Sequence, residues 1–110
     1  MAIKDLTKCE RHIFLCSGSS CTENGATELI HTIREEIRLQ GLHDCIHTTK
    51  TLCNGRCDDG PIVIIQPDGI WYRHVGANKA QRIVDEHLKN DRPIADLVLY
   101  RWGHSTLEDE

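Results

Sequence analysis

Residues 12–53, HIFLCSGSSCTENGATELIHTIREEIRLQGLHDCIHTTKTLC, decide the fold of this chain. The stretch opens with HIFLC, a short apolar run typical of a strand, and closes with residues 45–52, CIHTTKTL, which are rich in β-branched side chains. The apolar residues between them recur at helical spacing: Ala26, Leu29, Ile30, Ile33 and Ile37. A helical crossover places two such strands parallel to each other, so the stretch predicts a βαβ unit.

The flanking signals set the ends of this helix and extend the element order. Thr22 or Asn24 is a candidate N-cap, and Gly41 is the expected stop. Further along, PIVIIQ and IWYRHV flank the turn sequence at residues 67–69, Pro-Asp-Gly, which predicts a hairpin. Asn78 is the candidate cap of a last helix whose apolar face contains Ala80, Ile83, Val84, His87 and Leu88. The predicted order is βαβ followed by ββα.

Length and composition predict one small domain. The chain has 110 residues, of which 39% are hydrophobic, enough for a modest core. We expect a single domain over residues 1–110, with a core at about 12–100 and a mobile tail at 101–110, where the sequence has no apolar periodicity.

The net charge and the polarity of the chain indicate which partners and which compartment to expect. With 13 basic and 17 acidic residues, the net charge of -4 gives no support to nucleic-acid binding and suits docking to a basic patch on a redox protein. No apolar run approaches 18 residues, and the N-terminus is too polar for a signal peptide, so we expect a cytoplasmic protein without a membrane span. In that compartment six cysteines favour metal binding or catalysis over disulfides.

Two pairs of cysteines have the spacing of a metal site. Four residues separate Cys16 from Cys21, and three separate Cys53 from Cys57. Neither pair is the C-x-x-C of a zinc ribbon or a thioredoxin redox site. The wider loops suit a larger inorganic core, because a 2Fe-2S cluster needs two thiolates on each of its irons. Small residues in both loops let backbone N–H groups approach the sulfur atoms.

The remaining cysteines are poorer candidates. Cys9 has eleven residues between it and Cys21, so on spacing alone it could replace Cys16. However, Cys9 precedes the first predicted strand and Cys45 begins the second, which places both about 15 Å from the opposite sheet edge. We therefore predict that Cys16, Cys21, Cys53 and Cys57 are the ligands.

The histidines and the charged residues of the second loop leave alternatives open. Cys9-x-x-His12 and Cys45-x-His47 resemble the halves of a Rieske motif, but in reversed order and without glycine-rich loops, so structural or surface roles are favoured for the histidines. Arg56 lies between two predicted ligands and would stabilise a reduced cluster. The pair Asp58-Asp59 is either a solvated loop or a docking patch beside the cluster.

As a set, these motifs resemble a known family. HIFLC leading into Cys16, the Cys16-x4-Cys21 spacing followed by Gly25, LCNGRCDDGP and PIVIIQPDGIWY are similar to thioredoxin-like 2Fe-2S ferredoxins. That family is related to the small 2Fe-2S subunit of respiratory complex I and of hydrogenases. The resemblance implies an α/β, thioredoxin-like fold, with a mixed sheet in βαβ-ββα order and helices packed on it. It also implies one 2Fe-2S cluster per chain.

The functional expectation is a one-electron carrier. The chain has no G-x-G-x-x-G, no triad motif and no open coordination site, so we expect an electron-transfer protein and not an enzyme. Its expected partners are redox proteins such as a ferredoxin reductase or an acceptor enzyme, and a homodimer is left open. The alternatives are a subunit or accessory of a larger redox enzyme or cobalamin-pathway system, a structural four-cysteine zinc module, and a thiol-disulfide oxidoreductase.

Overall fold

A computed structural model describes residues 5–18, 23, 25–56, 59–104 and 106–107. Its strands are β1 (Arg11–Cys16), β2 (Ile46–Thr51), β3 (Val63–Gln66), β4 (Ile70–Tyr72) and β5 (Val98–Arg101). Its helices are α2 (Ala26–Leu39) and α3 (Ala80–Arg82), which continues as the π-helical η4 (Ile83–Lys89). Short 3-10 turns are η1 (Leu6–Lys8), η3 (Ala77–Lys79) and η5 (Ala95–Leu97).

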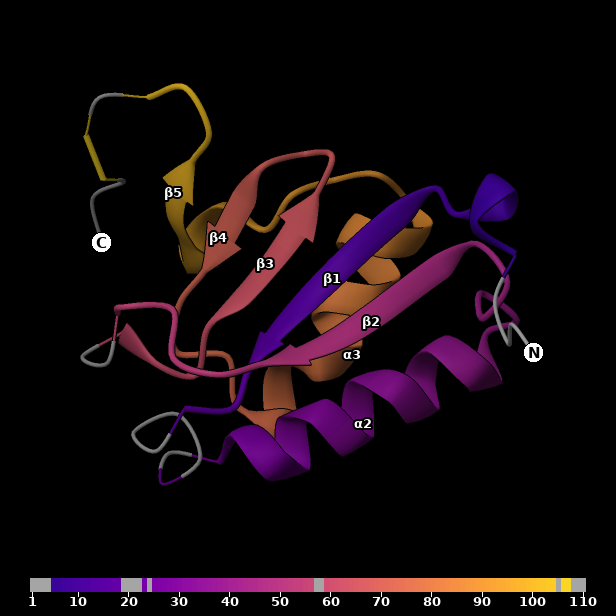
Figure 1. Cartoon of the computed structure of the whole chain (residues 1–110), viewed down its shortest axis with the longest axis horizontal. Helices are drawn as coiled ribbons and strands as arrows, with labels where there is room; N and C mark the ends of the chain where they lie inside the picture. Colours follow the sequence, from indigo (N-terminus) through magenta and orange to yellow (C-terminus); the bar gives the residue numbers. More distant parts are fainter. Residues whose placement is uncertain (1–4, 19–22, 24, 57–58, 105, 108–110) are drawn as a thin grey trace.

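The strands form one mixed sheet in the order β2-β1-β3-β4-β5 (Figure 1). β1 and β2 are parallel, as the βαβ prediction requires, and the other neighbours are antiparallel. The hairpin β3–β4 turns where the Pro-Asp-Gly sequence predicts it. The Gly60–Pro61 bond before the hairpin and the Gln66–Pro67 bond within it are both cis. The predicted thioredoxin-like mixed sheet is confirmed.

One strand was not predicted. β5 adds antiparallel to β4 and includes Arg101, the first residue assigned to a mobile tail. The backbone N–H of Trp102 then donates to the carbonyl of Gly69 at 2.8 Å, so the described chain continues along the hairpin turn. β5 has four residues and, unlike β3 and β4, does not flank the predicted hairpin turn, which is why the sequence pattern missed it.

The ends of the helices agree only in part with the predicted caps. α2 stops at Leu39, and Gly41 follows with a φ of 71°. The N–H of Leu42 bonds the carbonyl of Ile37 at 3.0 Å, which is the pairing of a Schellman stop. Thr22 and Asn24 lie outside the described residues. The cap predicted at Asn78 is wrong, because η3 precedes α3 and Asn78 lies inside that turn.

Both helices pack on one face of the sheet. A cross-strand row of Ile13, Ile65 and Ile70 meets the apolar stripe of α2 on that face. The apolar face predicted for the last helix is buried in the same core, including His87 at 0% exposure. No helix in the described ranges is long and apolar enough to cross a membrane.

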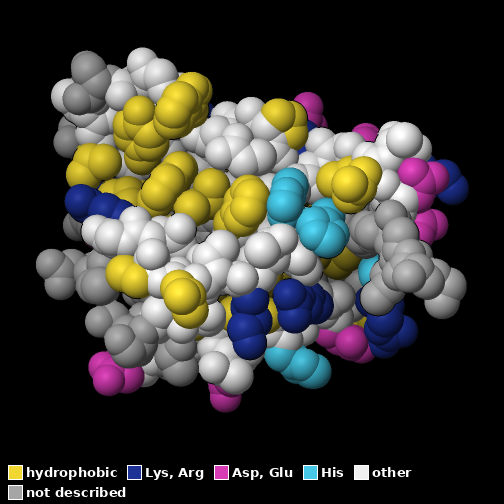
Figure 2. Space-filling model, viewed as in Figure 1, with side chains coloured by type: hydrophobic (Ala, Val, Ile, Leu, Met, Phe, Trp, Pro, Cys, Tyr) yellow, Lys and Arg dark blue, Asp and Glu magenta, His cyan; other side chains and the backbone are white. Residues whose placement is uncertain are grey.

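The opposite face of the sheet has its own apolar layer. Phe14, Ile64, Trp71 and Tyr100 are cross-strand neighbours in one row, and Cys16 belongs to the same cluster. Figure 2 shows apolar side chains gathered over the part of the sheet that contains β3, β4 and β5. Because alternate residues of a strand face opposite sides, Cys16 points to the face that carries no helix.

Candidate metal centre

Cys16 and Cys53 leave the sheet at the same edge. Cys16 is the last residue of β1, is 3% exposed, and lies opposite Thr51 at the end of the parallel strand β2. Cys53 follows two residues later and is exposed. The shared carboxyl edge is the one predicted from the βαβ unit. The other two predicted ligands, Cys21 and Cys57, lie outside the described residues.

The two loops approach each other through a glycine. A Cβ atom placed on Gly18 would lie 2.9 Å from the Cα and 3.0 Å from the Cβ of Cys53. Real Cβ atoms do not come this close to backbone, so only glycine allows the first loop to lie against Cys53 at this position. Sequence reasoning noted small residues in both loops but did not identify this contact.

Hydrogen bonds tie the first loop to the second. The backbone N–H and the hydroxyl of Ser17 both donate to the carbonyl of Thr51, at 2.8 and 2.6 Å. The Asn54 side-chain amide donates to the Thr51 hydroxyl at 2.8 Å, so Thr51 anchors both loops. This bonding fixes the positions of Cys16 and Cys53 relative to each other.

The sulfur surroundings suit a thiolate-bound metal group. The N–H of Gly55 points at the Cys53 sulfur at 3.3 Å, and such a bond stabilises negative charge on the sulfur. The Cys16 thiol donates to the carbonyl of Leu52 at 3.4 Å, which places its sulfur beside the residue that precedes Cys53. Thiolate donors, a donated N–H and glycine-permitted close packing together fit an iron–sulfur group.

Cys9 and Cys45 lie at the other end of the sheet. The Cys9 thiol donates to the Arg11 carbonyl at 3.2 Å, and the Cys45 thiol to the Leu42 carbonyl at 3.4 Å. Burial raises the pKa of the Cys45 thiol, which favours the protonated form that binds metal poorly. Both placements agree with the expectation from strand rise.

Among the described residues, no group of three His, Cys, Asp or Glu side chains forms a metal site. His12 hydrogen-bonds the Thr49 hydroxyl at 2.6 Å and packs edge-on against His47. Burial, followed by the nearby His47, lowers the pKa of His12. These contacts agree with the structural role expected for the two histidines and give no support to a Rieske site.

The sequence of this chain is similar to the sequences of known proteins. The chain matches the family of thioredoxin-like 2Fe-2S ferredoxins over residues 3–88. It is 38% identical over 98 residues to a protein of Priestia megaterium provisionally named a 2Fe-2S ferredoxin, covering 89% of this chain and 76% of that protein. It is 33% identical over 100 residues to a 2Fe-2S ferredoxin of Clostridium pasteurianum, covering 82% of this chain and 96% of that one.

A solved structure agrees with the sequence relatives. The thioredoxin-like 2Fe-2S ferredoxin of Aquifex aeolicus superposes with a TM-score of 0.80 at 29% identity, covering 86% of this chain and 94% of that one. This chain belongs to the thioredoxin-like 2Fe-2S ferredoxin family. Its cofactor is therefore a 2Fe-2S cluster, and its function is electron transfer.

Two charged residues of the second loop, Arg56 and Asp59, form an ion pair that the sequence did not predict. The Arg56 guanidinium pairs with the Asp59 carboxylate at 2.7 Å, and the Asp59 side chain is 16% exposed. Asp59 is thus not a solvated loop residue, and its charge is compensated by Arg56. Asp58 lies outside the described residues. The docking patch, which the sequence left open as the alternative at these two positions, gains no support at Asp59.

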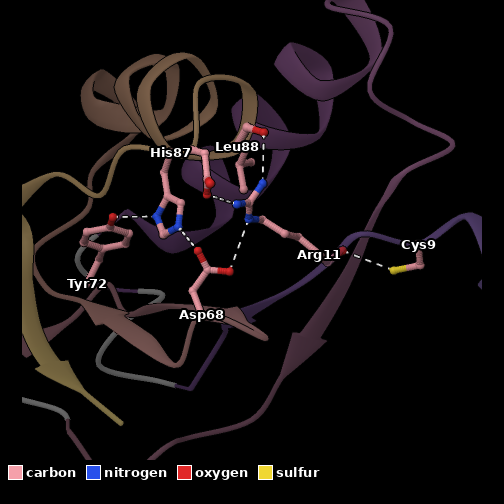
Figure 3. Close-up of polar contacts among 7 residues, drawn as sticks. Cys9, Arg11, Asp68, Tyr72, His87 and Leu88 are labelled. Atoms are coloured by element: carbon pink, nitrogen blue, oxygen red, sulfur yellow. Dashed lines mark hydrogen bonds and ion pairs between the residues drawn. The ribbon is translucent and has the colours of Figure 1, made fainter. Parts of the chain in front are cut away.

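A second polar cluster crosses the core of the ferredoxin (Figure 3). Buried His87 bridges two side chains: its Nδ1 meets the Tyr72 hydroxyl and its Nε2 meets the Asp68 carboxylate, both at 2.6 Å. Arg11 then pairs with Asp68 at 3.2 Å. The Tyr72 hydroxyl also accepts the backbone N–H of Ile94 at 3.0 Å. The sequence placed His87 on an apolar helix face but could not identify these partners.

The pKa values of Asp68 and Tyr72, which belong to this polar cluster, are both shifted from their usual values. Burial alone would raise the pKa of Asp68, but the hydrogen bond with His87 and the Arg11 charge outweigh it and hold that pKa below its usual value. Burial raises the pKa of Tyr72 to about 12, so its hydroxyl stays protonated as a donor. The network therefore links β1, β4 and η4 with an ionised Asp68 and a neutral Tyr72 at neutral pH.

Gly18→Ala is expected to weaken cluster retention. The new Cβ would collide with Cys53 and push the loops apart, and overpacking of this kind costs about 1–3 kcal/mol. We expect roughly tenfold faster bleaching of the visible absorbance by an iron chelator. The matched control is Gly76→Ala, whose Cβ would meet, among the described residues, only the movable side-chain oxygen of Asn78 within 4 Å. Equal bleaching rates in wild type and Gly18→Ala would show that the close approach is unimportant.

Proposed function

We propose that Cys16, Cys21, Cys53 and Cys57 hold the 2Fe-2S cluster of this chain, and that the protein carries single electrons between redox proteins. The observation that carries the proposal is the packing of Gly18 against Cys53, because it joins the first cysteine loop to the second. Cys16 and Cys53 supply one thiolate from each loop. The sequence spacing supplies Cys21 and Cys57 as the second thiolate of each pair.

The residues around the sulfur atoms stabilise the charge that electron transfer creates. A cluster held by these cysteines would supply one-electron redox chemistry. The Gly55 N–H compensates negative charge at the Cys53 sulfur. The Ser17 and Asn54 bonds to Thr51 keep the loop geometry fixed, so little reorganisation accompanies the change in charge. This arrangement suits a carrier that exchanges electrons with a protein reductase and a protein acceptor.

Metal analysis tests the proposal directly. Anaerobically purified protein is expected to contain about two irons and two acid-labile sulfides per chain, as one 2Fe-2S cluster requires. Reduction by dithionite is expected to produce a half-integer-spin electron paramagnetic resonance signal, because one electron enters an antiferromagnetically coupled ferric pair. Stoichiometric zinc without sulfide, in protein made with ample iron, would favour the structural zinc module instead.

A further inference from the structure

A groove of about 830 Å³ runs between α2 and β2. One wall is a stripe on α2 at helical spacing, and the other is formed by side chains of β2. Three isoleucines with little exposed surface, Ile30, Ile37 and Ile46, belong to its lining. The groove is therefore apolar between polar rims. A surface of this composition can take an extended chain segment with polar side chains at its edges.

The rim of this α2–β2 groove is basic, although the chain as a whole has a net charge of -4. Arg34, Arg38 and Lys50 line it, and Arg38 pairs with Glu35, the one acidic side chain in the described part of the lining. Arg34 donates to the Thr48 hydroxyl at 3.0 Å. In the ranges described, neither Arg34 nor Lys50 forms an ion pair. Figure 2 shows Lys and Arg side chains over the gap between β2 and α2.

The groove also includes the outer edge of the described sheet. β2 is the outermost strand, so half of its backbone polar groups point away from β1. His47 lines the groove together with Ile46 and Thr48, its neighbours on the opposite face of the strand. Because both faces of β2 contribute, the groove wraps around this edge. An extended segment lying there can pair with the edge through main-chain hydrogen bonds.

One end of the groove reaches the candidate metal centre. Ser17 lines the groove and directly follows Cys16 in the chain. Its bonds to the Thr51 carbonyl join this end to the loop that carries Cys53. A partner segment held in the groove would therefore lie beside the position from which electrons leave or enter.

We propose that the α2–β2 groove docks an extended acidic segment of a redox partner. The carboxylates of that segment pair with Arg34 and Lys50 at the rim, its apolar residues cover the isoleucines, and its backbone adds to the edge of β2. The proposal rests on the electron-transfer function but not on the identity of the four ligands. It places docking on a basic surface of an acidic protein, away from the compensated Arg56–Asp59 pair.

The test uses the cluster-loaded protein and a fluorescent peptide of alternating Glu and Val, about eight residues long, the length of an ordinary strand. Fluorescence anisotropy is expected to show binding at low salt that weakens at about 0.3 M salt, where exposed charges are screened. A peptide with Lys in place of Glu is expected not to bind. The double variant Arg34→Glu/Lys50→Glu is expected to bind the acidic peptide at least about tenfold more weakly, because two exposed ion pairs are replaced by repulsion.

The matched control is Lys89→Glu/Arg92→Glu, which makes the same change in net charge at two exposed residues outside the groove lining. It is expected to bind the peptide nearly as well as wild type. Equal weakening in both double variants would show that net charge alone controls binding, and would overturn the proposal. Unchanged binding in Arg34→Glu/Lys50→Glu would also overturn it. A dimer that dissociates only in the groove variant, without peptide binding, would assign the groove to a second copy. Cluster absorbance, recorded in every variant, shows separately whether the proposed ligands hold the cofactor.

Discussion

Replacing Cys16 or Cys53 by alanine is expected to remove essentially all of the 2Fe-2S cluster. Each change would delete one of the four proposed thiolates and leave one iron with an incomplete ligand set. Both side chains lie at the sheet edge where the two loops meet, so within the described residues no other cysteine is near enough to substitute. Iron and sulfide per chain, together with visible absorbance, measure the loss. The same result is expected for Cys21→Ala and Cys57→Ala.

The controls are Cys9→Ala and Cys45→Ala. Both thiols donate to nearby carbonyls at the beginnings of β1 and β2, about 15 Å along the strands from Cys16. We expect both variants to keep nearly the full iron and sulfide content. If Cys16→Ala keeps the cluster and Cys9→Ala loses it, the first ligand is Cys9 and the assignment to Cys16 is wrong.

Tyr72→Phe is expected to lower the free energy of unfolding by about 3 kcal/mol, because it leaves two buried polar groups without their partner. The Tyr72 hydroxyl bonds His87 Nδ1 at 2.6 Å and the Ile94 N–H at 3.0 Å, and the tyrosine is completely buried. Phenylalanine keeps the ring packing, so the loss comes from hydrogen bonding and not from a cavity. Urea unfolding followed by far-ultraviolet circular dichroism measures the change.

Tyr100→Phe is the matched control for this measurement. Tyr100 is half-buried in the apolar row on the other face of the sheet, and no described side chain or backbone group bonds its hydroxyl. Its replacement is expected to change the free energy of unfolding by less than about 0.5 kcal/mol. If Tyr72→Phe is no more destabilising than Tyr100→Phe, the bridge through His87 does not contribute to stability.

The sequence alone was sufficient for the elements that depend on local pattern. Apolar residues at helical spacing located α2, and the Pro-Asp-Gly turn located the hairpin β3–β4. The βαβ rule then placed Cys16 and Cys53 at one edge, and strand rise placed Cys9 and Cys45 at the other. These conclusions were available because period, turn chemistry and crossover geometry are read from neighbouring residues.

Only the tertiary structure decided which distant residues touch. Gly18 meets Cys53 across 35 positions of chain, and Arg11 reaches Asp68 across 57. Neither contact has a local signal, since a small loop residue and a charged strand residue have many possible partners. The α2–β2 groove has the same origin, because its basic rim exists only where a stripe of α2 lies beside the outer edge of β2. Packing selects one partner for each such residue, and that selection is a property of the assembled core.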